Sequence, residues 1–293
     1  MKKFTTESLL EIKNWLDSEL QLHSKVSFEI PNPDYSTGYK KWINLAELHF
    51  CRVLTPIKID EHRVRITFVK LNINDSFHTT PIDSREEKYG VSSKFFNINK
   101  NEEPTFLYAY YRALKAVKIE NRKDILNLGI NKGDEFELIA QILDKELFDK
   151  INFVGIDHSA SALTYAKKRF PKDNVIFHKQ DINKISELNL KKSDLIISIG
   201  TLQSPSINYK PFLMSLVQKY LTPNGAFILG FPNSRWIDNE LIYGAKAPNY
   251  PYSEMSLLFN DVIFAKKYLQ QKKFRVTITG REYIFLTATK IGL

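Results

Sequence analysis

Apolar residues recur in two rhythms along the chain, and these separate an irregular first third from a regular remainder. In the first third the pattern predicts amphipathic helices over 6–22 and 38–53, the former capped by Thr5 or Thr6, and an alternating strand over 62–71. The polar stretch 72–103 predicts a long loop, a feature that in compact proteins is usually functional or mobile. We therefore expect an α+β N-terminal domain over 1–103 with a lid-like loop over 72–103.

Strand-like and helix-like segments alternate from residue 104 to residue 293. Strands are predicted over 125–129, 152–156, 174–178, 194–199, 225–230, 274–279 and 283–289, and helices over 105–118, 133–147, 159–169, 182–188, 209–221 and 255–271. Such alternation is typical of a parallel sheet with helices on both faces, while the last two strands flank Gly280 as a hairpin would. We expect an α/β domain with a seven-stranded, mostly parallel sheet that ends in an antiparallel hairpin.

The connection after the first of these strands indicates a ligand-binding turn. Gly129 and Gly133 lie where the backbone bends from strand to helix, and a residue without Cβ allows a ligand to approach closely. A dinucleotide-binding turn needs a third glycine, but that position holds Asp134. Asp134 and Glu135 would also repel a pyrophosphate at the helix N-terminus, which argues against a nicotinamide-dependent oxidoreductase.

The segments after the strands resemble, in order, the motifs of class I, Rossmann-like S-adenosylmethionine-dependent methyltransferases. The resemblance covers about residues 105–290, through the segments 127–133, 153–157, 180–182, 194–201 and 221–225. In the first motif Asn127 replaces the usual acid and Asn131 the middle glycine, and asparagine tolerates the left-handed backbone conformation. The resemblance implies a Rossmann-like fold and S-adenosylmethionine as cofactor.

Family roles can be carried over to matching positions. Asp157 would accept the ribose hydroxyls, His158 would lie beside the adenine, and Asp181 would lie near the adenine amino group, although both acids also suit helix N-caps. Asn127 and Asn131 could equally serve turn formation alone. The implied cofactor-binding residues are Asn127, Gly129, Ile130, Asn131, Gly133, Asp134, Asp157, His158, Gln180, Asp181, Ile182, Ser198, Ile199 and Gly200.

The transfer site is expected beside the fourth strand of the sheet. Methyl transfer depends largely on positioning, so Thr201 and Gln203 are candidates for orienting the acceptor, or they form a polar loop tip. Substrate contacts are expected from Asn233 and Arg235 after the fifth strand, and from Tyr89 and Lys100 in the lid-like loop. The histidines show no metal-ligand spacing, so no metal is expected.

The distribution of charge along the chain bears on the identity of the methyl acceptor. The formal net charge is +9, and basic residues crowd the C-terminal end with Glu282 as the acid among them: Lys266, Lys267, Lys272, Lys273, Arg275, Arg281 and Lys290. Such a surface attracts a polyanion, although solvated helix faces also carry lysines. The acceptor is therefore RNA (tRNA or rRNA) or a small molecule, and a non-catalytic binding or scaffolding protein with this fold stays open.

Two absences guide the expected location of the protein. No apolar run approaches the roughly 18 residues of a membrane span, so no membrane partner is expected. The lone cysteine, Cys51, cannot form an internal disulfide, which fits a cytoplasmic protein.

Overall fold

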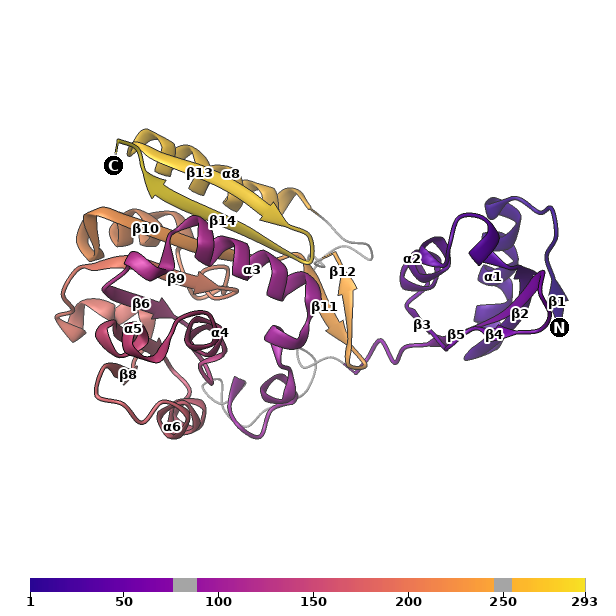
Figure 1. Ribbon diagram of the computed structural model, residues 1–293, viewed down its shortest axis with the longest axis horizontal. Coiled ribbons are helices and arrows are strands. Elements are labelled where there is room, and N and C mark those ends of the chain that lie inside the picture. Colours follow the sequence, from indigo (N-terminus) through magenta and orange to yellow (C-terminus); the bar gives the residue numbers. More distant parts are fainter. Residues whose placement is uncertain (76–88, 245–254, 293) are drawn as a thin grey trace. The chain divides into compact units, whose positions relative to one another are not determined.

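The computed structural model describes residues 1–75, 89–244 and 255–292 of the chain. These residues form two compact units, each built around its own sheet (Figure 1). Unit 1 comprises Met1–Thr80 and Trp236–Ile242, and unit 2 comprises Pro81–Arg235 and Tyr243–Leu293. A short segment from late in the chain therefore belongs to the first unit.

In unit 1, helices cover one face of a mostly antiparallel sheet. The strand order is β1-β2-β5-β3, and β4 pairs with β5. Val26, Phe28 and Ile30 of β2 point to the face on which α1 and α2 pack. The elements are β1 (Lys2–Lys3), α1 (Leu9–Leu22), β2 (Lys25–Pro31), η1 (Pro33–Tyr35), α2 (Lys40–Leu48), β3 (Cys51–Val53), β4 (Ile57–Lys58) and β5 (Arg63–Lys70).

Both predicted helices of unit 1 are shorter than their sequence patterns suggest. α1 is capped by Ser8, whose side chain accepts the Glu11 N–H while the Glu11 carboxylate accepts the Ser8 N–H. The prediction of Thr5 or Thr6 as the cap is wrong, because neither residue has an acid three positions later to complete this capping box. The second helix ends at Leu48 because Phe50 adopts a left-handed φ of 52°, and the chain continues as β3.

A hairpin from late in the chain contributes residues 236–242 to unit 1. It consists of β11 (Ser234–Ile237) and β12 (Glu240–Tyr243), and the sequence pattern did not predict it. Ile237 and Ile242 pack with Leu71, and Arg52 donates from Nη2 to the carbonyl oxygen of Asp238 at 2.9 Å. Because β11 begins two residues after β10 ends, one chain segment connects the two units directly.

Unit 2 confirms the predicted α/β fold class. Its seven-stranded sheet has the order β13-β14-β10-β9-β6-β7-β8, in which β14 is antiparallel to both of its neighbours. The strands are β6 (Asp124–Leu128), β7 (Asn152–Asp157), β8 (Val175–Lys179), β9 (Ser193–Ile199), β10 (Leu221–Pro232), β13 (Phe274–Gly280) and β14 (Tyr283–Lys290).

Helices cover both faces of this sheet. One face packs against α3, α4, α5 and α6, and the other against η6, α7, η7 and α8. The predicted helix 133–147 is two helices because Asp144 caps a new one, and the predicted helix 209–221 ends in the π-helical turn η7. The elements are η3 (Lys94–Asn97), η4 (Lys100–Glu102), α3 (Pro104–Ala116), η5 (Ile119–Asn121), α4 (Asp134–Ile142), α5 (Lys145–Lys150), α6 (Ala160–Arg169), η6 (Ile182–Leu188), α7 (Tyr209–Ser215), η7 (Leu216–Tyr220) and α8 (Ser256–Gln271).

Candidate functional site

The ends of adjacent parallel strands gather the predicted site residues at one edge of the unit 2 sheet. β10, β9, β6 and β7 are neighbours in that order and end at Pro232, Ile199, Leu128 and Asp157. The chain direction across the sheet reverses between β6 and β9, since β7 and β8 lie on one side of β6 and the later strands on the other. Open α/β sheets bind ligands outside the carboxyl ends of the strands at such a reversal.

The turn from β6 into α4 is tight and packs on the loop after β9. Gly129, Asn131 and Gly133 have positive φ values of 79°, 47° and 92°. A Cβ on Gly129 would lie 1.9 Å from Oγ1 of Thr201, so only glycine fits at this contact. The structure thus brings the predicted turn glycine and the predicted positioning residue together.

Asn127 lies beneath this turn with unmet hydrogen-bonding capacity. Its side chain is buried, and neither its amide oxygen nor its amide nitrogen has a hydrogen-bond partner. Nearby, Ser198 on β9 donates to the carbonyl oxygen of Leu128 at 3.2 Å and ties the two strands together. A buried amide without partners is costly, so a polar ligand group that reached Asn127 would be stabilised.

Asp157 is held rigidly at the end of β7. Its side chain is only 5% exposed, and its two carboxylate oxygens accept the backbone N–H groups of Asn131 and Ser159, each at 2.9 Å. Nδ1 of His158 lies 3.7 Å from Oδ1 of Asp157. Because each carboxylate oxygen has two lone pairs, Asp157 can accept further donors from a ligand.

Charged side chains form a network at the start of α4. Asp134 accepts from Nη1 of Arg169 at 2.8 Å, and Glu135 pairs with Nζ of Lys100 at 2.9 Å in the interior. Burial opposes the charge of Lys100, but the nearby Glu135 carboxylate raises the pKa of this ammonium above its usual value. All three acids of the first α4 turn are thus already matched by cations, since Glu137 also pairs with Arg169.

Residues 89–101 form a strap that is bonded to the turn and to α6. The carbonyl oxygen of Tyr89 accepts from Nδ2 of Asn131 at 2.7 Å, and the Val91 N–H donates to Oγ of Ser161 at 3.0 Å. Nζ of Lys132 donates to the carbonyl oxygens of Phe96 and Ile98, both at 2.7 Å. Residues 76–88 of the predicted lid-like loop lie outside the described residues.

Tyr89 stands close to the Asp157 and His158 pair. Its ring meets that of His158 edge-on, with the ring centroids 6.4 Å apart, and it also contacts Phe95 edge-on. Burial and the negative charge of Asp157 raise the pKa of the Tyr89 hydroxyl. Lys100, the other substrate candidate of the predicted lid, instead points into the network around Glu135.

The segment after β8 has an ordinary capping geometry. The side chain of Asp181 accepts the Asn183 N–H at 2.9 Å and begins η6, and the Gln180 side chain accepts the Asp181 N–H at 2.9 Å. Asp181 is exposed, whereas Ile182 is buried under the sheet.

Polar groups also surround the ends of β9 and β10. Asn233 is buried, and its Nδ2 donates to the Arg281 carbonyl oxygen at 2.9 Å, which leaves Oδ1 without a partner. Oε1 of Gln203 likewise lacks a partner, and burial lowers the pKa of Arg235. Ile199 is buried, and the exposed Gly200 that follows has a φ of 72°.

Sequence reasoning missed several residues of this edge. Glu282 is buried beside Asn233, whose N–H donates to the Glu282 carbonyl oxygen at 2.8 Å. Arg169 and Lys132 hold the first turn of α4 and the strap. The position of Glu282 in the final hairpin could have indicated its place at this edge, because the hairpin turn returns to the carboxyl end of β10. Nothing in the local sequence distinguished Arg169 and Lys132 from other basic residues.

Unit 1 contains a separate groove of about 640 Å³ between α2, β3 and β12. It is lined by Trp42, Arg52 and Glu240 among others, and none of the predicted cofactor residues lines it. Within the described ranges no cluster of His, Cys, Asp and Glu could hold a metal ion. In the same ranges every helix is too short or too polar to cross a bilayer.

Comparison with known proteins decides the family. The sequence profile of a family described as "Methyltransferase domain" matches residues 119–275, more than half of the chain. The chain belongs to this methyltransferase family. It is therefore a class I S-adenosylmethionine-dependent methyltransferase and an enzyme, rather than a non-catalytic protein that kept the fold. A search among curated proteins finds no match.

Several solved structures are similar to the methyltransferase. A putative S-adenosylmethionine-dependent methyltransferase from Listeria monocytogenes is 18% identical with a TM-score of 0.44, covering 63% of this chain and 99% of that chain. A putative caffeoyl-CoA O-methyltransferase from Staphylococcus aureus is 16% identical with a TM-score of 0.44, covering 62% and 83%. The N-methyltransferase NodS from Bradyrhizobium japonicum, in complex with S-adenosyl-L-homocysteine, is 15% identical with a TM-score of 0.43, covering 64% and 88%.

Proposed function

We propose that this methyltransferase transfers the methyl group of S-adenosylmethionine to an RNA, with Asp157 as the central cofactor-binding residue. The observation that carries the cofactor site is the rigid, buried carboxylate of Asp157 at the strand reversal, with lone pairs left for two ribose hydroxyls. His158 and Tyr89 contact each other beside this carboxylate, and these two rings would hold the adenine. Unit 1 is assigned to acceptor recognition.

The residues of the β6–α4 turn fit the other end of the cofactor. S-adenosylmethionine carries an ammonium and a carboxylate, and the unpartnered amide of Asn127 offers both an acceptor and a donor to such groups. Asp134 is neutralised by Arg169, so it acts through the shape of the turn rather than as a free charge. For the exposed Asp181, contact with the adenine amino group requires that its carboxylate also keep its capping bond to Asn183.

The protein contributes positioning to the transfer step. The cofactor supplies a methyl group activated by attachment to a sulfonium. Thr201 packs on the glycine turn, and the unpartnered Oε1 of Gln203 on the same loop is available to hold a donor group of the acceptor. Asn233 offers a second unpartnered oxygen after β10, and holding an acceptor in a fixed geometry lowers the barrier to displacement.

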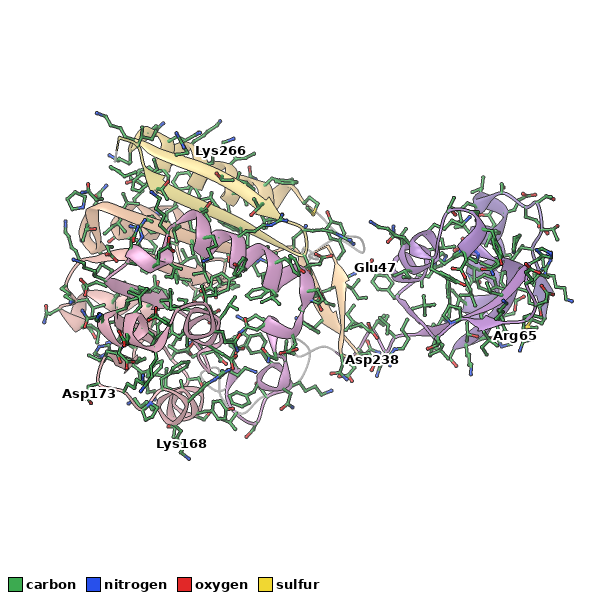
Figure 2. All side chains as sticks on the ribbon, viewed as in Figure 1. Glu47, Arg65, Lys168, Asp173, Asp238 and Lys266 are labelled. Carbon is green, nitrogen blue, oxygen red and sulfur yellow. The ribbon has the colours of Figure 1, made fainter. Side chains whose placement is uncertain are left out.

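The basic C-terminal surface supports an RNA acceptor. Exposed cations are Lys267 on α8, Arg275 on β13 and Lys273 in the turn between these elements, and Figure 2 labels Lys266 on α8. The register pairs Phe274 with Lys290 and Pro232 with Tyr283, so the start of β13 lies at the opposite edge of the sheet from the cofactor residues. The regularly paired part of β10, from Ala226 to Pro232, spans roughly 20 Å. These cations would therefore anchor a long, structured RNA away from the transfer site.

Two measurements test the proposed function. Calorimetry with S-adenosylhomocysteine should show binding, and methyl incorporation from labelled S-adenosylmethionine should occur with a total RNA preparation but not after RNase treatment. The variant Lys267→Gln/Lys273→Gln/Arg275→Gln should bind RNA more weakly and with a shallower salt dependence, since each lost phosphate contact lowers the slope by about 0.7–0.9. Incorporation that resists RNase, with a flat salt response, would favour a small-molecule acceptor.

A further inference from the structure

One face of the unit 1 sheet carries an unusual set of cations. The register places Arg65 opposite Glu29, Glu29 opposite Lys3, and Lys25 opposite Val69, all on the face away from Phe28 and Ile66. Arg63 lies two residues before Arg65 and so shares this face. The hydrophobic core formed with α1 and α2 lies on the other side, so these helices do not cover the cations.

Glu29 lies between these cations and accepts from Nη2 of Arg65, while Nη2 of Arg63 donates to the carbonyl oxygen of Phe4 at 3.1 Å. The buried Glu29 carboxylate lies 3.5 Å from Nζ of Lys3, 3.7 Å from Nε of Arg63 and 3.5 Å from Nη2 of Arg65. The buried Nε groups of Arg63 and Arg65 have no hydrogen-bond partner. Three cations around one carboxylate leave an excess of two positive charges, and the guanidinium groups retain unused donors.

Among the neighbouring side chains on this face, Ser27 and Thr67 are small and polar, whereas Pro31, Ile57 and Val69 are apolar. Oγ of Ser27 and Oγ1 of Thr67 are 2.8 Å apart and satisfy each other across β2 and β5. The face shows no aromatic side chain among the residues paired in the register, so it offers no platform for stacking bases. Its chemistry suits the phosphate oxygens of a nucleic acid backbone, which accept hydrogen bonds from arginine and lysine.

We propose that Lys3, Lys25, Arg63 and Arg65 form a docking face for the phosphate backbone of the acceptor RNA. This inference rests on the proposed RNA acceptor and adds the part of unit 1 that holds it. Successive side chains on one face of a strand are about 7 Å apart, so the cations are spread along β2 and β5 rather than collected at one point. Figure 2 labels Arg65 on unit 1, among these strands. Binding here is independent of base sequence.

The test compares variants of the full chain that remove equal charge from the two faces of unit 1. Lys3→Gln/Lys25→Gln removes exposed cations from the docking face, while Lys13→Gln/Lys40→Gln removes exposed cations from α1 and α2. Fluorescence anisotropy measures binding of a labelled single-stranded RNA and a labelled stem-loop. The face variant should bind RNA roughly 10- to 50-fold more weakly at about 0.1 M salt. The negative slope of log K against log salt should become shallower by about 1.5.

Testing Arg63 and Arg65, which contact the buried Glu29, needs a variant that leaves no unpaired buried charge. Glu29→Gln/Arg63→Gln/Arg65→Gln removes the carboxylate together with the two guanidinium groups that surround it, and circular dichroism checks that the unit folds. This variant should also weaken RNA binding, whereas the α1 and α2 control should bind within about twofold of the unaltered protein. Both RNAs should give similar affinities whatever their base sequence.

The outcomes separate the docking face from the proposed function. Equal RNA binding by the face variants and the helix control overturns the docking face and leaves the RNA acceptor intact. Failure of the unaltered protein to bind RNA, with normal binding of S-adenosylhomocysteine, overturns both the docking face and the RNA acceptor but not the methyltransferase. Face-dependent binding to vesicles containing phosphatidylserine, without RNA binding, also overturns the proposal.

Discussion

Replacing Asp157 by alanine should remove most of the affinity for the cofactor. If its carboxylate accepts two ribose hydroxyls, each bond to a charged acceptor contributes about 1.5–3 kcal/mol. Together they are worth about 3–6 kcal/mol, which corresponds to roughly a 10²- to 10⁴-fold rise in Kd for S-adenosylhomocysteine. Calorimetry measures this change directly.

The same substitution should also loosen the turn. Asp157→Ala leaves the N–H groups of Asn131 and Ser159 without their acceptor, at about 1–3 kcal/mol if water does not replace it. A loss of about 2 kcal/mol lowers Tm by roughly 4–8 °C in a unit of this size. Asp157→Asn keeps one acceptor oxygen and should lose cofactor affinity with a smaller change in Tm.

A matched control separates the two effects. Asp144→Ala removes a carboxylate that accepts the Leu147 N–H at 2.7 Å and caps α5, so it lowers stability by about 1 kcal/mol without touching the strand ends. It should bind S-adenosylhomocysteine normally. If Asp157→Ala binds within about threefold of the unaltered protein at a temperature where both are folded, the ribose assignment is refuted.

Three further substitutions or modifications test the site and the fold. Gly129→Ala should lower the free energy of unfolding in urea by about 2–5 kcal/mol, because the new Cβ meets Thr201 and φ at this position is positive. Adding Thr201→Gly should recover the loss caused by the clash but not the loss caused by the positive φ. Lys100→Met should cost about 3–5 kcal/mol by stranding Glu135, and Lys100→Met/Glu135→Gln less. Because the pKa of Lys100 is raised in the fold, its contribution should be full below about pH 10, the unfolded value, and decline above it; a contribution that grew with pH would contradict this. Burial raises the pKa of Cys51 to about 11, so a thiol reagent at pH 8 should label it only after unfolding, and rapid labelling of the folded protein would contradict its burial.

The unit 2 sheet was predictable because its strands and helices follow simple periodicities. Buried strands such as β6 and β9 read as mainly apolar runs, each interrupted by one polar residue, Asn127 or Ser198, and Gly280 marks the final hairpin. β2 was missed although Val26, Phe28 and Ile30 alternate in the sequence, because its polar positions resemble those of the surrounding loops. Strand order and the reversal between β6 and β9 are long-range properties that no local pattern contains.

Less of the candidate site could be predicted. The turn residues and Asp157 are recognisable because they follow strand ends, but their partners come from distant segments: Asn131 bonds to Tyr89, and Lys132 bonds to Phe96 and Ile98. The β11–β12 hairpin also escaped detection, although Asp238 and Asn239 have φ values of 49° and 63° as a tight two-residue turn requires. Asparagine and aspartate at such a turn are a weaker signal than the usual glycine.

The hairpin restricts how this protein can be divided. Cutting the chain near residue 80 would separate Ile237 and Ile242 from Leu71 and leave both isoleucines exposed on the isolated catalytic unit. The same cut would leave Arg52 without Asp238 and Glu240 on the isolated N-terminal piece. The two units therefore cannot be exchanged as independent modules. A truncated chain needs a short turn in place of the hairpin before either half is expected to stay soluble.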